Sequence, residues 1–272
     1  MKTITTIKRS LVAILAVAIL VPSLQSCKKT VTPKKLDGEW NVTSGSTTST
    51  YTSSTGTTTT TASTFDGAKE TITTTPCVGC SPVINDKTVS FTFDKKAGTY
   101  TMVTVATEND VEEDRNYYTK NATTPVTYNN DGKFDRKIKA VSTTTEQGTY
   151  TVTGGTGEIE KNSQIVLSET STVSNTDYTY TYFEAGTSTA LVITDKYEQE
   201  SSSGGSVYKL LVATKNELTT HTGKTFQNIT MNVESLKKGV MEVNYSYSDD
   251  YTSGATTTKN TSETKWTLTE KE

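Results

Sequence analysis

The sequence is poor in the residues that most often carry chemistry. It contains one histidine, three cysteines, two tryptophans and five prolines among 272 residues. The lone histidine, His221, cannot by itself complete a catalytic triad or a structural zinc site, because such zinc sites take four ligands that are typically Cys or His. No nucleophile motif of the G-x-S-x-G type occurs either. We therefore expect no enzymatic activity and neither a metal nor another cofactor.

The chain also lacks a clustered basic surface. Once the three basic residues of the first 26 are set aside, 24 Lys+Arg stand against 30 Asp+Glu. Nucleic-acid binding calls for a basic patch or stripe. We therefore expect no nucleic-acid partner.

No apolar run is long enough to cross a membrane as a stable helix. The longest, "LVAILAVAILV", has eleven residues, from Leu11 to Val21, about half of the ~20 that a spanning helix requires. It follows a basic start with Lys2, Lys8 and Arg9. A short apolar core behind a basic start predicts a secretory signal peptide, and a permanent transmembrane anchor is the alternative.

The residues after this run are more specific than an ordinary cleavage site. The segment "LQSC", from Leu24 to Cys27, resembles the lipobox of bacterial lipoproteins. The resemblance implies that residues 1–26 are removed and that Cys27 carries fatty acyl chains that tether the protein to the lipid bilayer. Residues 27–35 would then be the lipidated terminus and a polar leash.

The leash "KKTVTPKK" contains four lysines and no acidic residue. Each lysine near an anionic membrane surface is attracted by about 1 kcal/mol. The leash should then lie close to the bilayer instead of projecting the domain outward. We therefore expect an outer-membrane lipoprotein that faces the periplasm, with exposure on the cell surface as the alternative.

The rest of the chain is rich in strand-forming residues. Threonine occurs 60 times; it is β-branched and suits a pleated surface, while its hydroxyl tolerates water. Alternating apolar and polar residues predict about a dozen strands, which include 88–93, 98–107, 163–169, 177–183, 189–195, 206–214, 226–233, 239–247 and 264–270. The threonine-rich segment 44–64 fits either hairpin strands or disorder.

Two polar segments are expected between strands. The acidic residues of 108–114 indicate a solvated loop, with weak calcium binding as the alternative. The "NNDG" of 129–132 indicates a tight hairpin turn, because calcium-loop ligands are missing at the expected positions.

Strands at short spacing without interleaved helices predict a single all-β domain over residues 36–272. Its fold class is an antiparallel barrel or sandwich with long hairpins.

A lipobox, a short leash and then "L-x-G-x-W" at the start of a β domain resemble the lipocalin-like lipoproteins of Bacteroidota-type bacteria. Later segments, "FTFDKKAGTYTMV" and "KWTLTEKE", continue the resemblance. It implies a lipocalin-like barrel closed at one end by Gly38 and Trp40. Lipocalins often stack an arginine of the last strand over that tryptophan, whereas only Lys265 and Lys271 are present in the corresponding region here.

Two cysteines remain once Cys27 is lipidated. Cys77 and Cys80 are separated by two residues, and an exported chain occupies an oxidising compartment. No βαβ pattern of a redox enzyme surrounds them. A disulfide between Cys77 and Cys80 is the prediction, and a pair of free thiols is the alternative.

Tyrosines alternate along two predicted strands, at positions Tyr178, Tyr180, Tyr182, Tyr245 and Tyr247. Such aromatic ladders either face a ligand or stabilise pairing between strands.

The sequence leaves three function hypotheses. The first is a non-catalytic lipoprotein that binds a small apolar or amphipathic ligand in its barrel. The second is a structural or adhesive envelope protein that binds glycan or protein through Thr/Tyr-rich strand faces, and the third, least supported, is a hydrolase. An apolar cavity in the barrel favours the first hypothesis, and a filled core favours the second.

Overall fold

The computed structural model describes residues 34–77, 79–153, 158–202, 205–222, 228–253 and 256–271. Residues 1–33, which include the predicted signal peptide and Cys27, lie outside these ranges. Residues 35–272 form one compact unit. Within the described ranges no helix has the length and apolar character needed to span a bilayer.

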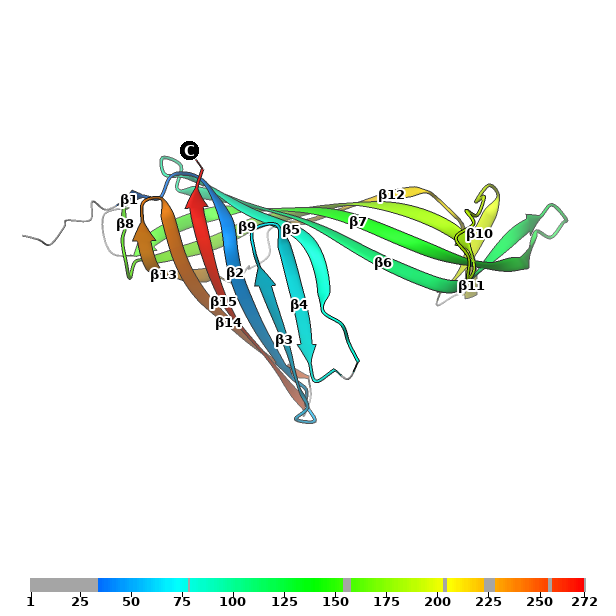
Figure 1. Cartoon of the computed structure of the whole chain (residues 1–272), viewed down its shortest axis with the longest axis horizontal. Coiled ribbons are helices and arrows are strands. Elements are labelled where there is room, and N and C mark those ends of the chain that lie inside the picture. Colours follow the sequence, from blue (N-terminus) through cyan, green and yellow to red (C-terminus); the bar gives the residue numbers. More distant parts are fainter. Residues whose placement is uncertain are drawn as a thin grey trace, which may run out of the picture. The chain divides into compact units, whose positions relative to one another are not determined.

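The regular structure of these residues consists of strands (Figure 1). They are β1 (Lys34–Lys35), β2 (Gly38–Thr52), β3 (Thr58–Phe65), β4 (Lys69–Thr75), β5 (Val83–Asp94), β6 (Thr99–Asn121), β7 (Thr127–Thr153), β8 (Glu158–Ile159), β9 (Gln164–Glu184), β10 (Lys196–Ser202), β11 (Gly205–Leu210), β12 (Thr214–Thr222), β13 (Ile229–Lys237), β14 (Val240–Ser253) and β15 (Thr256–Glu270).

A closed ring of hydrogen-bonded strands forms one end of the sheet, here called the base. Strands β2, β5, β6, β7, β9, β13, β14 and β15 each pair antiparallel with the next, and β15 returns to β2. The neighbours follow chain order, which is the order of an up-and-down barrel. The predicted all-β antiparallel fold with long hairpins is confirmed.

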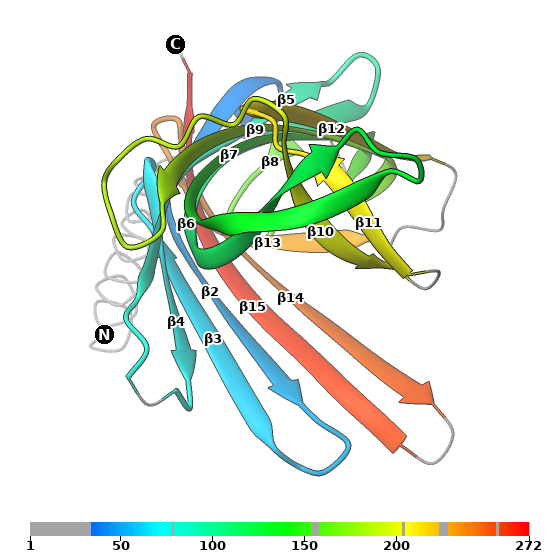
Figure 2. The same cartoon turned by 90° about the vertical axis from the view of Figure 1, so that its right-hand side faces the viewer.

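Beyond the base, two ring contacts end and the strands separate into two groups. The β2–β5 pairing covers only 38–41 against 90–93, after which the hairpin β3–β4 is inserted between those strands. The β9–β13 pairing covers only 164–167 against 229–232, after which β12 lies along β9. We call β3–β2–β15–β14 the fan, and β6–β7–β9–β12 with the hairpin β10–β11 the arm (Figures 1 and 2).

The apolar core lies in the base because the alternating apolar side chains of the ring strands point inward there. In β5, for example, Val89, Phe91 and Phe93 are buried and the residues between them are polar. The buried members of this core are Leu36, Trp40, Val42, Phe65, Val89, Phe91, Phe93, Tyr100, Ile159, Ile165, Leu167, Met231, Val233, Met241, Val243 and Leu268. Further along β2, β9, β14 and β15 the same inward positions are mostly Thr, Ser and Tyr.

Several local predictions were wrong. Residues 189–195 are not a strand; they form a loop whose Leu191 and Ile193 pack against buried Phe134 and Tyr182. The acidic segment 108–114 is part of strand β6 and not a loop, because its pairing with β7 continues through it. The predicted turn at 129–132 lies inside β7, where Gly132 pairs with Tyr117 at a β-bulge. Residues 163–169 and 177–183 belong to one strand, β9.

The segment that fitted either strands or disorder, residues 44–64, belongs mostly to a hairpin. It covers the end of β2 and most of β3, which pair from Gly45–Phe65 to Thr52–Thr58. Thr and Ser occupy most of these positions, so both faces of the hairpin remain polar.

A glycine at the edge of the core makes a close approach that no other residue permits. A Cβ at Gly148 would lie 2.8 Å from the ring of Tyr100 and 2.9 Å from Cα of Glu169, and would also collide with the carbonyl of Ser168. We therefore expect Gly148→Ala to lower the free energy of unfolding by about 1–3 kcal/mol, the usual cost of overpacking. Urea denaturation measures the change, with the exposed neighbour Thr149→Ala as the matched control. Equal stability of the two variants would contradict the packing described here.

Candidate functional site

The interior of the base is filled by side chains. An eight-stranded ring is just wide enough for side chains to fill it or for one small ligand to occupy it. Here Trp40, Phe91, Phe93 and Leu268 are at most 1% exposed. The two residues expected to close the barrel lie in this region: Trp40 is part of the core, and Gly38 begins β2 with φ +83°.

The two lysines near the C-terminus do not take the place of the arginine seen in lipocalins. Lys271 Nζ lies 2.6 Å from Glu39 Oε2, and its backbone N–H donates to the carbonyl of Glu39. Lys265 lies opposite Asn244 and Ser46 on the outward face of the fan. The indole N–H of Trp40 donates to the carbonyl of Asp37 at 3.4 Å.

Two carboxylates lie directly above the filled core, at the mouth of the base. Tyr100, Gly148 and Glu169 are cross-strand neighbours on β6, β7 and β9, and Met102, Glu146 and Thr172 form the next row. Since Tyr100 and Met102 belong to the core or pack against it, the two glutamates share its inward face. The hydroxyl of Thr172 donates to Glu169 Oε1.

Burial changes the acidity of this group of side chains. Removal from water raises the pKa of Glu146 to about 7, and the negative charge of Glu169 adds to the rise. Burial also raises the pKa of Tyr100 and of Tyr245, a fan residue whose phenol feels the charge of Glu146. Glu146 is therefore half protonated near neutral pH.

A groove of about 410 Å³ lies on the fan, and we call it the fan groove. Tyr51 and Tyr247 are 44% and 41% exposed, so ring surface is available there. Cross-strand pairing places both on the face that continues the barrel interior, since Tyr247 follows Val243 and Tyr245 at intervals of two. The groove is lined by Ser49, Thr50, Tyr51, Thr59, Thr61, Tyr247, Asn260, Thr261 and Ser262.

A larger hollow of about 610 Å³ on the same sheet offers less to a ligand. Of its two aromatic side chains, Phe65 is buried in the core and Trp266 already packs against Phe91, Tyr245 and Gly45. Its polar groups Asn244 and Glu242 are hydrogen-bonded to neighbouring side chains on β13. The fan groove is the better candidate for a binding surface because its two tyrosines are exposed, whereas Phe65 is buried and Trp266 is half-buried.

The five tyrosines singled out from the sequence have different surroundings. Tyr178 and Tyr180 stack in parallel on the arm, with ring centroids 6.0 Å apart, and Tyr182 continues the ladder but is buried. Tyr182 donates its hydroxyl to the carbonyl of Val212 at 2.9 Å. Tyr245 packs edge-on against Trp266. Only Tyr247 of this set lines the fan groove.

A buried ion-pair cluster joins three strands at the far end of the arm. Arg136 of β7 is 8% exposed and donates to Glu112 of β6 at 3.0 Å and to Glu198 of β10 at 3.1 Å. Burial by itself would lower the pKa of Arg136, but hydrogen bonds to Tyr182 and Glu112 and the charge of Glu198 raise it above its ordinary value. The guanidinium therefore stays charged and holds β10 against the arm.

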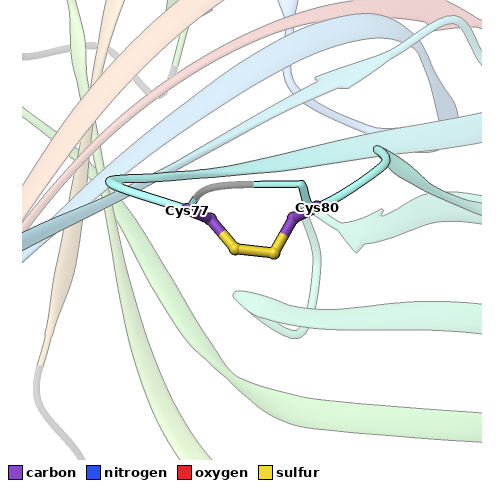
Figure 3. The surroundings of a disulfide bond; sticks show 2 residues. All are labelled: Cys77 and Cys80. Carbon is purple, nitrogen blue, oxygen red and sulfur yellow. A yellow bond between two sulfur atoms is a disulfide. The ribbon is translucent and has the colours of Figure 1, made fainter.

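Cys77 and Cys80 are joined by a disulfide in the turn between β4 and β5, with their Cα atoms 5.7 Å apart (Figure 3). This separation is in the usual range for a disulfide. Gly79 within the turn has φ +81°, a conformation that glycine adopts readily. The bridge is exposed and closes the turn after Thr75, so we assign it a role in holding the turn.

The remaining residues considered in the sequence analysis are His221, the possible metal ligands and Cys27. His221 is an exposed residue of β12, paired with Thr172, and lies in a strand and not in a loop. No group of three or more His, Cys, Asp or Glu in the described ranges could hold a metal ion. Cys27 lies outside the described residues.

No protein-family model matches this chain, and neither a curated protein nor a solved structure is found to match it.

Sequence reasoning missed the carboxylate pair and the Arg136 cluster. Glu146 and Glu169 are 23 positions apart and become neighbours only through the β7–β9 register. A count of inward positions from Tyr100 along β6 and its partners would have found them, but only after the register was known.

The raised pKa of Glu146 predicts a pH dependence of stability. Because the native protein holds this proton more tightly than the unfolded chain, the free energy of unfolding should fall as pH rises from about 4.5 to about 7. We expect Glu146→Gln to remove this slope and to stabilise the protein at pH 8 by about 1–3 kcal/mol, while changing little at pH 4. Urea denaturation across this pH range measures the effect, with exposed Glu263→Gln as the control. An unchanged slope in Glu146→Gln would refute the assignment.

Proposed function

We propose that the protein is a membrane-anchored, non-catalytic binding protein of the bacterial cell envelope whose Thr/Tyr-rich strand faces bind glycan. The observation that carries the proposal is the fan groove, where two half-exposed tyrosine rings lie among serine, threonine and asparagine side chains. Sugar rings present C–H faces that pack on aromatic rings, and hydroxyls that both donate and accept hydrogen bonds.

The filled base supports this proposal over a barrel that holds a small apolar ligand. Such a ligand would have to displace Trp40, Phe91, Phe93 or Leu268, whose burial contributes about 1.5–3 kcal/mol each. A polar groove on a strand face requires no such displacement.

The anchor belongs to the same proposal. Acylated Cys27 would hold the chain to the outer membrane, and the lysines of the leash would keep its first residues near anionic headgroups. This arrangement favours the periplasmic face, where the glycan of the cell wall is within reach. Purified peptidoglycan is therefore among the probes below.

The groove is tested by sedimentation of the detergent-solubilised, lipidated protein with insoluble glycans: peptidoglycan sacculi, cellulose, chitin and xylan. We expect the wild type to sediment with at least one of them. We expect Tyr51→Ala/Tyr247→Ala to bind that glycan about tenfold more weakly, a loss of about 1.4 kcal/mol. Leu218→Ala, which removes a 66% exposed side chain of β12, is the matched control. Binding of all three proteins alike would remove the groove from the proposal, and no binding by the wild type to any of the four would refute it.

The anchor is tested by metabolic labelling with radioactive palmitate. We expect the wild type to incorporate label and to fractionate with membranes, and Cys27→Ser to do neither, because one residue provides the attachment atom. Cys77→Ser/Cys80→Ser is the control and should be labelled like the wild type. Equal labelling of the Cys27→Ser variant and the wild type would contradict the proposed anchor.

A further inference from the structure

Another hollow lies at the far end of the arm, and we call it the arm-end pocket. It has a volume of about 250 Å³. Its residues come from β6 and from β10, two strands that are distant in sequence. They are Asp114, Arg115, Asn116, Tyr118, Glu198 and Gln199.

The backbone of this pocket has an unusual local conformation. The β6–β7 register shifts between Glu112 and Arg115, and Asp114 within the shift has φ +55°. A carboxylate on the neighbouring strand holds this conformation: Asp135 Oδ1 accepts the N–H of Asp114 at 3.0 Å. Bulges re-aim side chains and are frequent beside functional sites, and strained backbone is concentrated there too.

The walls of the pocket are held in place by the buried Arg136 cluster. Glu198 lies between the guanidinium of Arg136, at 3.1 Å, and that of Arg115, at 3.6 Å. Its side chain is only 15% exposed, and that of Arg136 is 10% exposed. A side chain fixed in this way loses little conformational freedom on binding, so the Glu198 carboxylate of the pocket is pre-organised.

Aromatic rings adjoin these polar groups. Tyr118 packs edge-on against Tyr208 at 5.0 Å, and Tyr208 stacks on Tyr128 at 4.1 Å. Tyr197 also packs edge-on against Tyr128, with ring centroids 5.2 Å apart. Of these rings Tyr118 lines the pocket, which therefore combines two carboxylates, a guanidinium and two amides with one aromatic ring.

We propose that the arm-end pocket binds one sugar ring and is a second glycan subsite of this protein. Carboxylate, guanidinium and amide groups can engage pairs of neighbouring hydroxyls, and the ring of Tyr118 suits the C–H face of a pyranose. The volume lies below the usual range of about 300–1,000 Å³ for drug-sized ligands, which favours a single ring. This inference rests on the proposed glycan-binding function and adds a site to it.

The two sites lie on different groups of strands. The arm-end pocket is near the end of β6, about 45–60 Å of extended strand beyond Tyr100 of the base, whereas the fan groove is formed by β2, β3, β14 and β15. A polymer that engages both sites gains effective concentration at the second once it is bound at the first. The affinity of the protein for a long glycan that reaches both sites should therefore be higher than the affinity of either site alone for a single sugar.

Saturation-transfer difference NMR on the detergent-solubilised, lipidated protein tests the pocket directly. The probes are the methyl glycosides of glucose, galactose, mannose and N-acetylglucosamine at 5–10 mM, concentrations that detect weak binding. The pocket variant is Asn116→Ala/Tyr118→Ala. The matched control is Tyr197→Ala, which removes a tyrosine of the same aromatic group that does not line the pocket. The groove variant Tyr51→Ala/Tyr247→Ala is measured alongside.

We expect the signal of at least one glycoside to fall about tenfold or more in the pocket variant and to persist in Tyr197→Ala and in the groove variant. If the pocket variant binds every glycoside as the wild type does, the second subsite is refuted while the proposed function stands. If the wild type binds none of the glycosides and sediments with none of the glycans, both the subsite and the proposed function are refuted. A circular-dichroism melt shows whether the pocket variant is folded. If it is unfolded, Asn116→Asp/Tyr118→Phe is measured in its place, because this variant keeps the shape of both side chains, and we expect it to weaken binding at least threefold. Undiminished binding by that folded variant refutes the subsite.

Discussion

Burial of apolar side chains at the base is the interaction on which the rest of the structure depends. Trp40, Phe91, Phe93 and their neighbours exclude water from the closed ring, and each large side chain buried in this way contributes about 1.5–3 kcal/mol. Outside the base most inward positions are threonine, serine or tyrosine, which cannot drive folding to the same degree. Because β2, β6, β7, β9, β14 and β15 run through the base and beyond it, their pairing in the fan and arm inherits the register established there.

The arm needs a second fixed point because it extends well past the core. Its far end has one, in which buried Phe134, Tyr182 and Leu211 pack together and Arg136 is paired with two glutamates. An ion pair in such surroundings loses much of its Coulomb gain to desolvation. Its geometry is nevertheless specific, since it requires Glu112, Arg136 and Glu198 from three strands, and it therefore determines where the hairpin β10–β11 lies.

Between these two fixed points the inward face of the arm is a ladder of hydroxyls. Ser142 and Thr176 lie 2.9 Å apart, and Thr144 and Ser174 lie 3.1 Å apart. Such pairs stabilise neighbouring strands modestly and leave a hydrated surface. At the fan groove and at the arm end, tyrosines with exposed or partly exposed side chains lie among such polar residues. The binding surfaces that we propose lie where an aromatic ring and polar groups occur together, on strands that the core or the ion-pair cluster holds in place.

The amino-acid sequence by itself determined the fold class and most of the strands, because the period-two alternation of apolar and polar residues depends only on which faces a strand presents. It failed where local composition suggested loops: the charges of 108–114 and the "NNDG" of 129–132 lie within long strands, since pairing with β7 and β6 outweighs local turn preference. The strand expected at 189–195 was wrong for the opposite reason, because Leu191 and Ile193 make apolar contacts without sheet pairing.

Only the tertiary structure decided which side chains meet. Register brought Glu146 beside Glu169 and placed Tyr51 and Tyr247 in one groove. A one-residue shift in pairing would reverse every one of these faces, and nothing in a single strand encodes the register of its partner.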